Sequence, residues 1–201
     1  MAIHNLNADF STGADGYPSF FFSAKTEASA PAQQYFRKLS TDFSILVHVR
    51  PHKAVGGFLF AVVSPVNSIV QLGLEVSESE SATGVAATDV TLYYTDYRSA
   101  KSSSSLAVFT VVPEMVNRWT LLAVRVRGED VTLYDNCNFF NEIRLTRKRT
   151  PELTFDNGST FYLGQRGSRQ SRKFEVTVMT VTAEEFRRAV TGIPIRTITQ
   201  A

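Results

Sequence analysis

The chain has 201 residues, of which 43% are hydrophobic and 20% are charged, a composition that suits a single folded domain and excludes a disordered chain. The net charge of +2 selects no class of partner, and no apolar run approaches the roughly 18 residues that a membrane-spanning helix needs. The single cysteine, Cys137, excludes an internal disulfide, and the first residues lack a signal-peptide pattern, so these features alone fit either an intracellular protein or an excised mature fragment.

Short strands separated by turns are predicted along most of the chain. Residues 1–16 are polar and contain two glycines, so we expect a flexible leader there, followed by one domain over 17–190 and a tail over 191–201. Period-two alternation, or a short apolar run bounded by turn residues, predicts strands. These strands cover 43–49, 58–63, 69–76, 90–95, 106–112, 119–127, 131–135, 142–146, 161–164 and 174–181. The segments 75–88 and 99–105 are rich in small polar residues and are expected as surface loops.

One segment near the C-terminus predicts a helix. Thr182-Ala183-Glu184-Glu185 has the form of a capping box, in which the Thr182 side chain caps a backbone amide and Glu185 reaches back to the cap. The helix would continue through 186–190 and end at Gly192 and Pro194. Many short strands, one terminal helix and no alternation of strand and helix predict an all-β fold: a two-sheet antiparallel β-sandwich with a short C-terminal helix.

The segment 144–173 is the most strongly charged part of the chain. It contains eight Lys or Arg residues and two acids, a local net charge of +6, so the rest of the chain carries −4. A linear polyanion such as heparan sulfate needs several cations held along a surface, and the guanidinium fork of arginine matches its sulfate and carboxylate oxygens. The candidate glycosaminoglycan-binding residues are Arg144, Arg147, Lys148, Arg149, Arg166, Arg169, Arg172 and Lys173.

The two halves of this cluster could form one patch, because loops at one end of a sandwich lie close together. Arg125 and Arg127, which should face outward from a strand, could extend it. The alternatives are a solvated loop that only keeps the protein soluble, or another acidic partner. The cluster lacks interleaved aromatic residues, which disfavours single-stranded nucleic acid.

Other motifs give weaker indications. His48 and His52 share a spacing of four, but Pro51 lies between them and no carboxylate or cysteine is near in sequence, so no metal site is expected. No motif of a catalytic site or of a cofactor site occurs, and no catalytic residue or cofactor is expected. Asn157-Gly158-Ser159 is an N-glycosylation sequon that is equally an ordinary hairpin turn. Cys137 is either a buried small hydrophobe or an exposed thiol that pairs between chains.

An ordered series of strand motifs carries a family resemblance. The motifs are FSILVHVRP (43–51), GFLFA (57–61), LGL (72–74), LYYT (92–95), NRWT (117–120), VTLYDNC (131–137) and FYLGQ (161–165). In this order they resemble the thrombospondin N-terminal-like domains, which are sandwiches of the laminin-G type, and most of all those of the multiplexin collagens, types XV and XVIII. The resemblance covers roughly residues 17–190. In the family, the cysteine at the position of Cys137 usually pairs with one just after a C-terminal helix, and here no cysteine follows that segment.

The resemblance implies a concanavalin or laminin-G-like jelly roll that is secreted into the extracellular matrix. It implies a non-enzymatic binding and cell-adhesion module of a collagen-like, basement-membrane protein. The expected partner is heparin or heparan sulfate, with other matrix proteins as further candidates and neither nucleic acid nor membrane insertion expected. Oligomerisation is expected through regions outside this chain. The alternatives are a protein–protein adhesion module of the same fold that binds no glycosaminoglycan, and a lectin or glycan-active sandwich.

Overall fold

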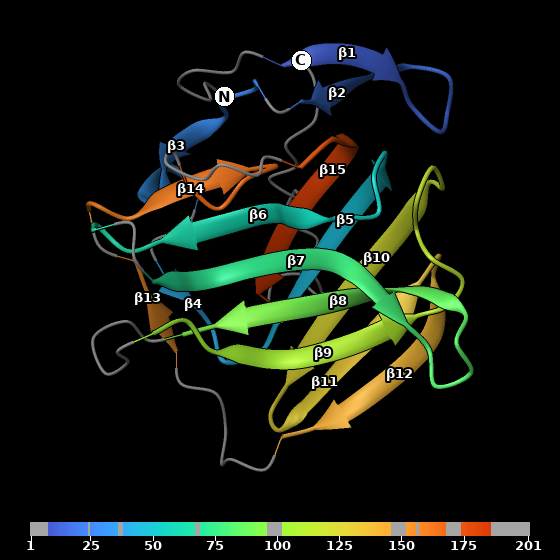
Figure 1. The fold of residues 1–201 in the computed structure, drawn as a ribbon. Helices are drawn as coiled ribbons and strands as arrows, with labels where there is room; N and C mark the ends of the chain where they lie inside the picture. The colour runs from blue at the N-terminus through green and yellow to red at the C-terminus, as the bar shows by residue number, and fades with distance from the viewer. Residues whose placement is uncertain are drawn as a thin grey trace.

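Two antiparallel sheets face each other in the computed structural model (Figure 1). The structure describes residues 8–23, 25–35, 38–66, 69–95, 102–145, 152–155, 157–167 and 174–185. Within these ranges, regular structure is almost entirely β, and the one helical element is the 3-10 turn η1 (Ala32–Gln34). No helical segment in the described ranges has the length and apolar character that a bilayer crossing requires. The predicted two-sheet antiparallel sandwich is confirmed.

The larger sheet has seven strands, and the last described strand lies inside it. In spatial order the strands are β1 (Asp9–Thr12), β2 (Pro18–Phe22), β15 (Val176–Glu185), β5 (Phe43–Pro51), β10 (Thr120–Arg127), β11 (Asp130–Asp135) and β12 (Asn138–Arg144). Every neighbouring pair is antiparallel. The β10–β11 hairpin turns at Gly128, as the sequence predicts, and Gly128 N–H donates to Asp42 Oδ1 at 2.8 Å.

The smaller sheet has six strands and forms the front layer of Figure 1. Its spatial order is β3 (Ser29–Pro31), β14 (Thr160–Leu163), β6 (Gly57–Val63), β7 (Val70–Glu80), β8 (Ala86–Tyr94) and β9 (Ser105–Val111). A separate two-stranded pair joins β4 (Lys38–Leu39) to β13 (Leu153–Thr154).

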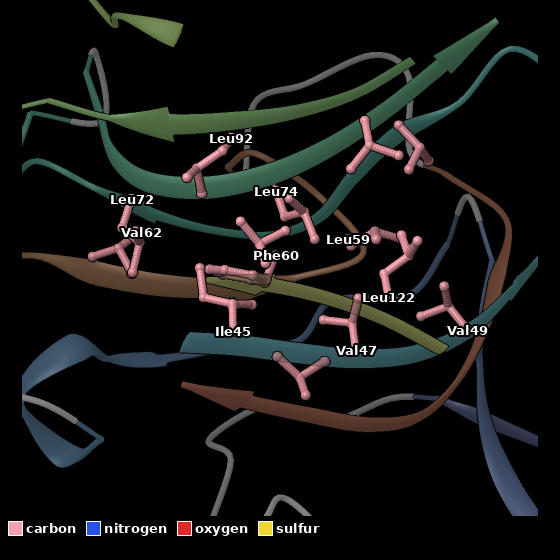
Figure 2. Packing of buried hydrophobic residues seen from close by; sticks show 14 of the residues in the cluster. Ile45, Val47, Val49, Leu59, Phe60, Val62, Leu72, Leu74, Leu92 and Leu122 are labelled. Atoms are coloured by element: carbon pink, nitrogen blue, oxygen red, sulfur yellow. The ribbon is translucent and has the colours of Figure 1, made fainter. Parts of the chain in front are cut away.

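The core lies between the two sheets and follows the alternation in the sequence. Ile45, Val47 and Val49 of β5 are fully buried, and Figure 2 shows them facing side chains of the opposite sheet. Those side chains include Leu59, Phe60, Val62, Leu72, Leu74 and Leu92. The residues between them on β5 point away from the core and have partly or fully exposed side chains. Burying this many apolar side chains is the main stabilising contribution, at about 25 cal/mol per Å² of apolar surface removed from water.

The C-terminal helix prediction was wrong for residues 182–185. Thr182 pairs with Leu46 of β5, and the pairing continues to Glu185, which lies beside Phe43. A capping box stabilises a helix by a few local hydrogen bonds, whereas a ten-residue strand inside the sheet gains a continuous ladder of backbone hydrogen bonds. The tertiary pairing therefore overrides the local signal. Residues 186–190 lie outside the described residues.

Three further predictions differ from the structure. The expected loop 75–88 is a long hairpin, because β7 runs to Glu80 and β8 begins at Ala86. Its small polar residues line two paired strands in place of an irregular loop. The expected leader contains β1, which pairs along β2 from Asp9↔Phe21 to Thr12↔Pro18. Cys137 is exposed in the turn between β11 and β12, so the buried alternative is wrong.

Candidate binding surface

The structure describes two of the eight basic residues that the sequence singles out. Arg144 ends β12 with its side chain exposed, and its Nη2 lies 3.3 Å from Glu129 Oε2. Arg166 follows β14 and is half-buried. The other six lie outside the described residues: Arg147, Lys148, Arg149, Arg169, Arg172 and Lys173.

One described flank of each basic segment belongs to the seven-stranded sheet, and these two flanks lie at opposite ends of it. Arg144 pairs with Asp130, beside the end of β10 and the first residue of β5, Phe43. The second segment leads into β15, whose first residue, Val176, pairs with Pro51 at the far end of β5. A ten-residue strand separates the two ends, a distance of about 30 Å. The single patch stays a prediction, because six of its eight residues lie outside the described residues.

Between these ends, the outward side chains of the seven-stranded sheet form an arginine and aromatic surface. Leu122, Val124 and Val126 of β10 are buried in the core, so Arg125 and Arg127 face outward, as the alternation predicts. We call this the outer face of the seven-stranded sheet.

Arg125 is held by its neighbours on this face. Its Nη2 donates to Thr132 Oγ1 at 3.5 Å and lies 4.0 Å from Glu142 Oε2. Its Cζ lies 5.9 Å from the ring centre of Tyr134. Thr132 Oγ1 in turn donates to the same Glu142 carboxylate at 2.8 Å. The charge of Arg125 is therefore largely compensated within the protein.

Arg50 has a different environment, which sequence reasoning missed. Its Cζ lies 5.3 Å from the ring centre of Trp119, and its Nη2 donates to Ser11 Oγ at 3.4 Å. Its Nε is inaccessible to solvent and has no hydrogen-bond partner in the described part of the chain. No described carboxylate forms an ion pair with Arg50. An arginine that stacks on an indole without a neutralising acid is suited to bind an anionic group.

The two histidines near Arg50 are held in their neutral form. Burial lowers the pKa of His48 below its ordinary value of 6.5, and the Asp15 carboxylate partly opposes this shift. Burial, and next the positive charge of Arg50, lower the pKa of His52, while Glu175 opposes the shift. The His48 ring lies edge-on to Trp119 at 5.1 Å between ring centres. At neutral pH these two histidines therefore add no positive charge beside Arg50, and the Asp15 and Glu175 carboxylates lie close enough to act on them.

The described residues contain no group of three or more His, Cys, Asp or Glu side chains that could hold a metal ion. His52 instead shares a hydrogen bond of 2.7 Å with Thr177 Oγ1.

The pairing of β5 with β10 explains why Arg50 was missed. Thr120 pairs with Val49, which brings Trp119 opposite Arg50, although the two residues are far apart in sequence. The alternation of β5 predicts that Arg50 faces outward. Nothing in the local sequence indicates which residue lies beside it.

A curated relative shares sequence with most of this chain. The chain is 30% identical over 158 residues to the human Collagen alpha-1(XVIII) chain. The aligned region covers 78% of this chain and 9% of that collagen. The resemblance to the multiplexin collagens is confirmed. The chain thus spans about a tenth of the length of this collagen relative. No family model matches the chain.

Solved structures share the fold. A heptameric SAP-like pentraxin from Limulus polyphemus superposes with a TM-score of 0.56 at 11% identity, covering 90% of this chain and 77% of the pentraxin. Domain 4 of AbnA, an extracellular arabinanase from Geobacillus stearothermophilus, was solved in complex with arabinotriose. It gives a TM-score of 0.51 at 13% identity, covering 89% of this chain and 75% of that domain. Both likenesses concern the sandwich fold alone.

Proposed function

We propose that this chain is a non-enzymatic binding module of the extracellular matrix, and that it binds heparin or heparan sulfate. The observation that carries the proposal is Arg50, which stacks on Trp119 and has no ion pair with a described carboxylate. The similarity to a collagen chain supports secretion and a place in the matrix.

The surface has the shape that a linear polyanion needs. From Trp119 to Arg125 the chain runs six residues along β10, which is about 20 Å of outward-facing surface. Beyond Arg125 the strand continues to Arg127 and to the end of the sheet where Arg144 lies. The second basic segment leads into β15 at the Arg50 end. We propose that the two segments are the ends of one track along this face, with Arg50 and Arg125 between them.

The arginines along this track differ in how far a carboxylate of the protein compensates their charge, and this difference sets how strongly each can bind a sulfate. Arg125 and Arg144 each face a carboxylate of the protein, at 4.0 Å and 3.3 Å, so a sulfate must compete with that carboxylate. Arg50 has no such competitor among the described ion pairs. We therefore propose Arg50 as the strongest single contact among the described arginines.

Two other functions compete with this one. A protein–protein adhesion module of the same fold would leave the basic segments incidental, and its heparin retention would not depend on Arg50. A glycan-active or lectin-like sandwich would cleave a glycan or bind a neutral one. The fold alone does not exclude it, because an arabinanase domain shares the sandwich.

Heparin-affinity chromatography in a salt gradient tests the proposal. Arg50→Gln keeps a polar side chain, although a shorter one, and removes the charge, and we expect it to elute at clearly lower salt. Each lost cationic contact also flattens the dependence of log affinity on log salt. Lys25→Ala, which removes one exposed positive charge in the link between β2 and β3, is the matched control and should elute with the parent. Equal elution of Arg50→Gln and the parent would contradict the assignment of Arg50.

The basic segments are tested in two halves, because their flanks lie at opposite ends of the sheet. The first variant changes Arg147, Lys148 and Arg149 to Ala. The second variant changes Arg169, Arg172 and Lys173 to Ala. Each half should lower the eluting salt, and the six changes together should abolish retention at physiological salt with the β circular dichroism unchanged. Each exposed contact contributes only about 0.2–1 kcal/mol, so the combined loss decides the outcome. Full retention by the sixfold variant would refute heparin binding through these segments.

Incubation of the parent chain with heparan sulfate separates binding from catalysis. We expect the polysaccharide to keep its length. Shortening of the chain would favour the glycan-active alternative.

A further inference from the structure

The sequon Asn157-Gly158-Ser159 lies in the turn that leads into β14 (Figure 1). The structure separates its two polar side chains. Asn157 is exposed. Ser159 is 1% exposed, and its Oγ donates to Gln71 Oε1 at 2.8 Å. The Ser159 carbonyl also accepts the Ala32 N–H at 2.8 Å.

We propose that Asn157 carries an N-linked glycan and that the glycan is added before the domain folds. The proposal rests on the secretion that the proposed function includes. The co-reactant is an oligosaccharide linked to a lipid through a diphosphate. A bond forms between Asn157 Nδ2 and the anomeric carbon of the first sugar, and the bond from that carbon to the diphosphate breaks. The lipid diphosphate leaves with the electron pair of that bond, and the amide nitrogen releases one proton.

The order of events follows from the burial of Ser159. The hydroxyl of the third residue is part of the acceptor sequence that the transferase recognises. In the folded chain this hydroxyl is enclosed beside Gln71, whose side chain is also 1% exposed. Reaching it would require the turn to open and the main-chain bond from Ala32 to break. The unfolded chain presents the same three residues freely.

The folded turn can carry the product without rearrangement. The Asn157 side chain faces solvent, so a glycan extends away from the protein. Gly158 packs against Pro65, where an added Cβ would lie 3.0 Å from the proline Cβ, and this contact fixes the turn beneath the glycan.

The glycan site and the Arg50–Trp119 pair lie on different sheets. Asn157 precedes β14 of the six-stranded sheet, while Arg50 and Trp119 lie on the outer face of the seven-stranded sheet. A glycosylated chain should therefore bind heparin like an unglycosylated one.

The test secretes the full chain from mammalian cells behind a signal peptide and treats it with an amidase that releases N-glycans. We expect most secreted chains to lose the mass of one N-glycan and to show aspartate at position 157 in the released peptide. Asn157→Gln should be secreted without this mass. A folded, secreted parent chain that carries no glycan at Asn157 would overturn the proposal.

The timing is tested with purified transferase and its lipid-linked donor. The bacterially made, folded chain should be a poor acceptor, at least tenfold slower than a peptide spanning residues 152–167. Equal rates would overturn the inference that glycosylation precedes folding.

Heparin elution of the unglycosylated chain is measured separately. A glycan without heparin retention would contradict the proposed function alone, and retention without a glycan would contradict this inference alone.

Discussion

The hydrogen bond between Ser159 and Gln71 gives a prediction of definite size. Ser159→Ala removes the hydroxyl that donates to Gln71 Oε1 at 2.8 Å, and both side chains are about 1% exposed. Gln71 Nε2 has no hydrogen-bond partner in the described part of the chain, so the variant leaves this amide side chain without any described partner. A buried polar group that loses its partner costs about 1–3 kcal/mol, and we expect about 2 kcal/mol of lost unfolding free energy.

Thermal and urea unfolding of the unglycosylated chain measure this loss. For a chain of this length, 1 kcal/mol shifts the Tm by about 2–4 °C, so Ser159→Ala should melt about 4–8 °C below the parent. Asn157→Gln destroys the same sequon at an exposed position and should stay within about 0.5 kcal/mol of the parent. The double variant Gln71→Leu/Ser159→Ala should recover part of the loss, because no polar group is then left buried. If Ser159→Ala has the same Tm as Asn157→Gln, the hydrogen bond contributes nothing to the stability and the prediction is wrong.

Three further predictions concern single positions. Gly164→Ala adds a Cβ 3.1 Å from the Phe22 Cβ at a φ of +66°, so urea unfolding should show a loss of at least about 1 kcal/mol, and an unchanged midpoint would contradict the strain. Because burial lowers the pKa of His48, protonation favours the unfolded chain. The free energy of unfolding of the parent should therefore fall as the pH drops below about 6.5, and this loss is complete below the pKa of His48 in the folded chain. His48→Gln should reduce this pH dependence, and identical pH profiles for variant and parent would contradict the prediction. Asn136 and Cys137 have φ angles of 49° and 66°, which is the backbone of a two-residue turn that favours Asn-Gly. Cys137→Gly should therefore raise the free energy of unfolding by about 0.5 kcal/mol. A free energy of unfolding below that of the parent would contradict this prediction.

Most of the fold could be predicted, because the burial of a strand determines the local pattern of apolar and polar residues in its sequence. The alternation of β5 and the apolar run of β6 each reflect which side chains face the core, and both strands appear where expected. The end of β15 could not be predicted in this way. Thr182 and Glu185 satisfy a helix-capping pattern locally, and only the distant strand β5 makes the extended conformation preferable.

The candidate surface was less predictable than the fold. Charge density along the sequence indicates the basic segments, and the alternation of β10 correctly turns Arg125 outward. The local sequence does not indicate, however, which arginine charges are compensated by a nearby carboxylate. That Arg125 faces Glu142 while Arg50 faces Trp119 depends on strand register, which is fixed by the whole sheet.

The position of β15 links the order of synthesis to the order of assembly. This strand is the last of the described strands to be synthesised, yet it lies between β2 and β5 in the seven-stranded sheet. Until residues 176–178 are made, the β1–β2 hairpin lacks the described strand through which it joins that sheet, and β5 has one of its two partners only after β15 is made. Because such long-range pairing is slow to form, we expect the seven-stranded sheet to close late. If the chain is secreted as proposed, the acceptor turn at Asn157 is made before β15, so it enters the export route before the seven-stranded sheet can close.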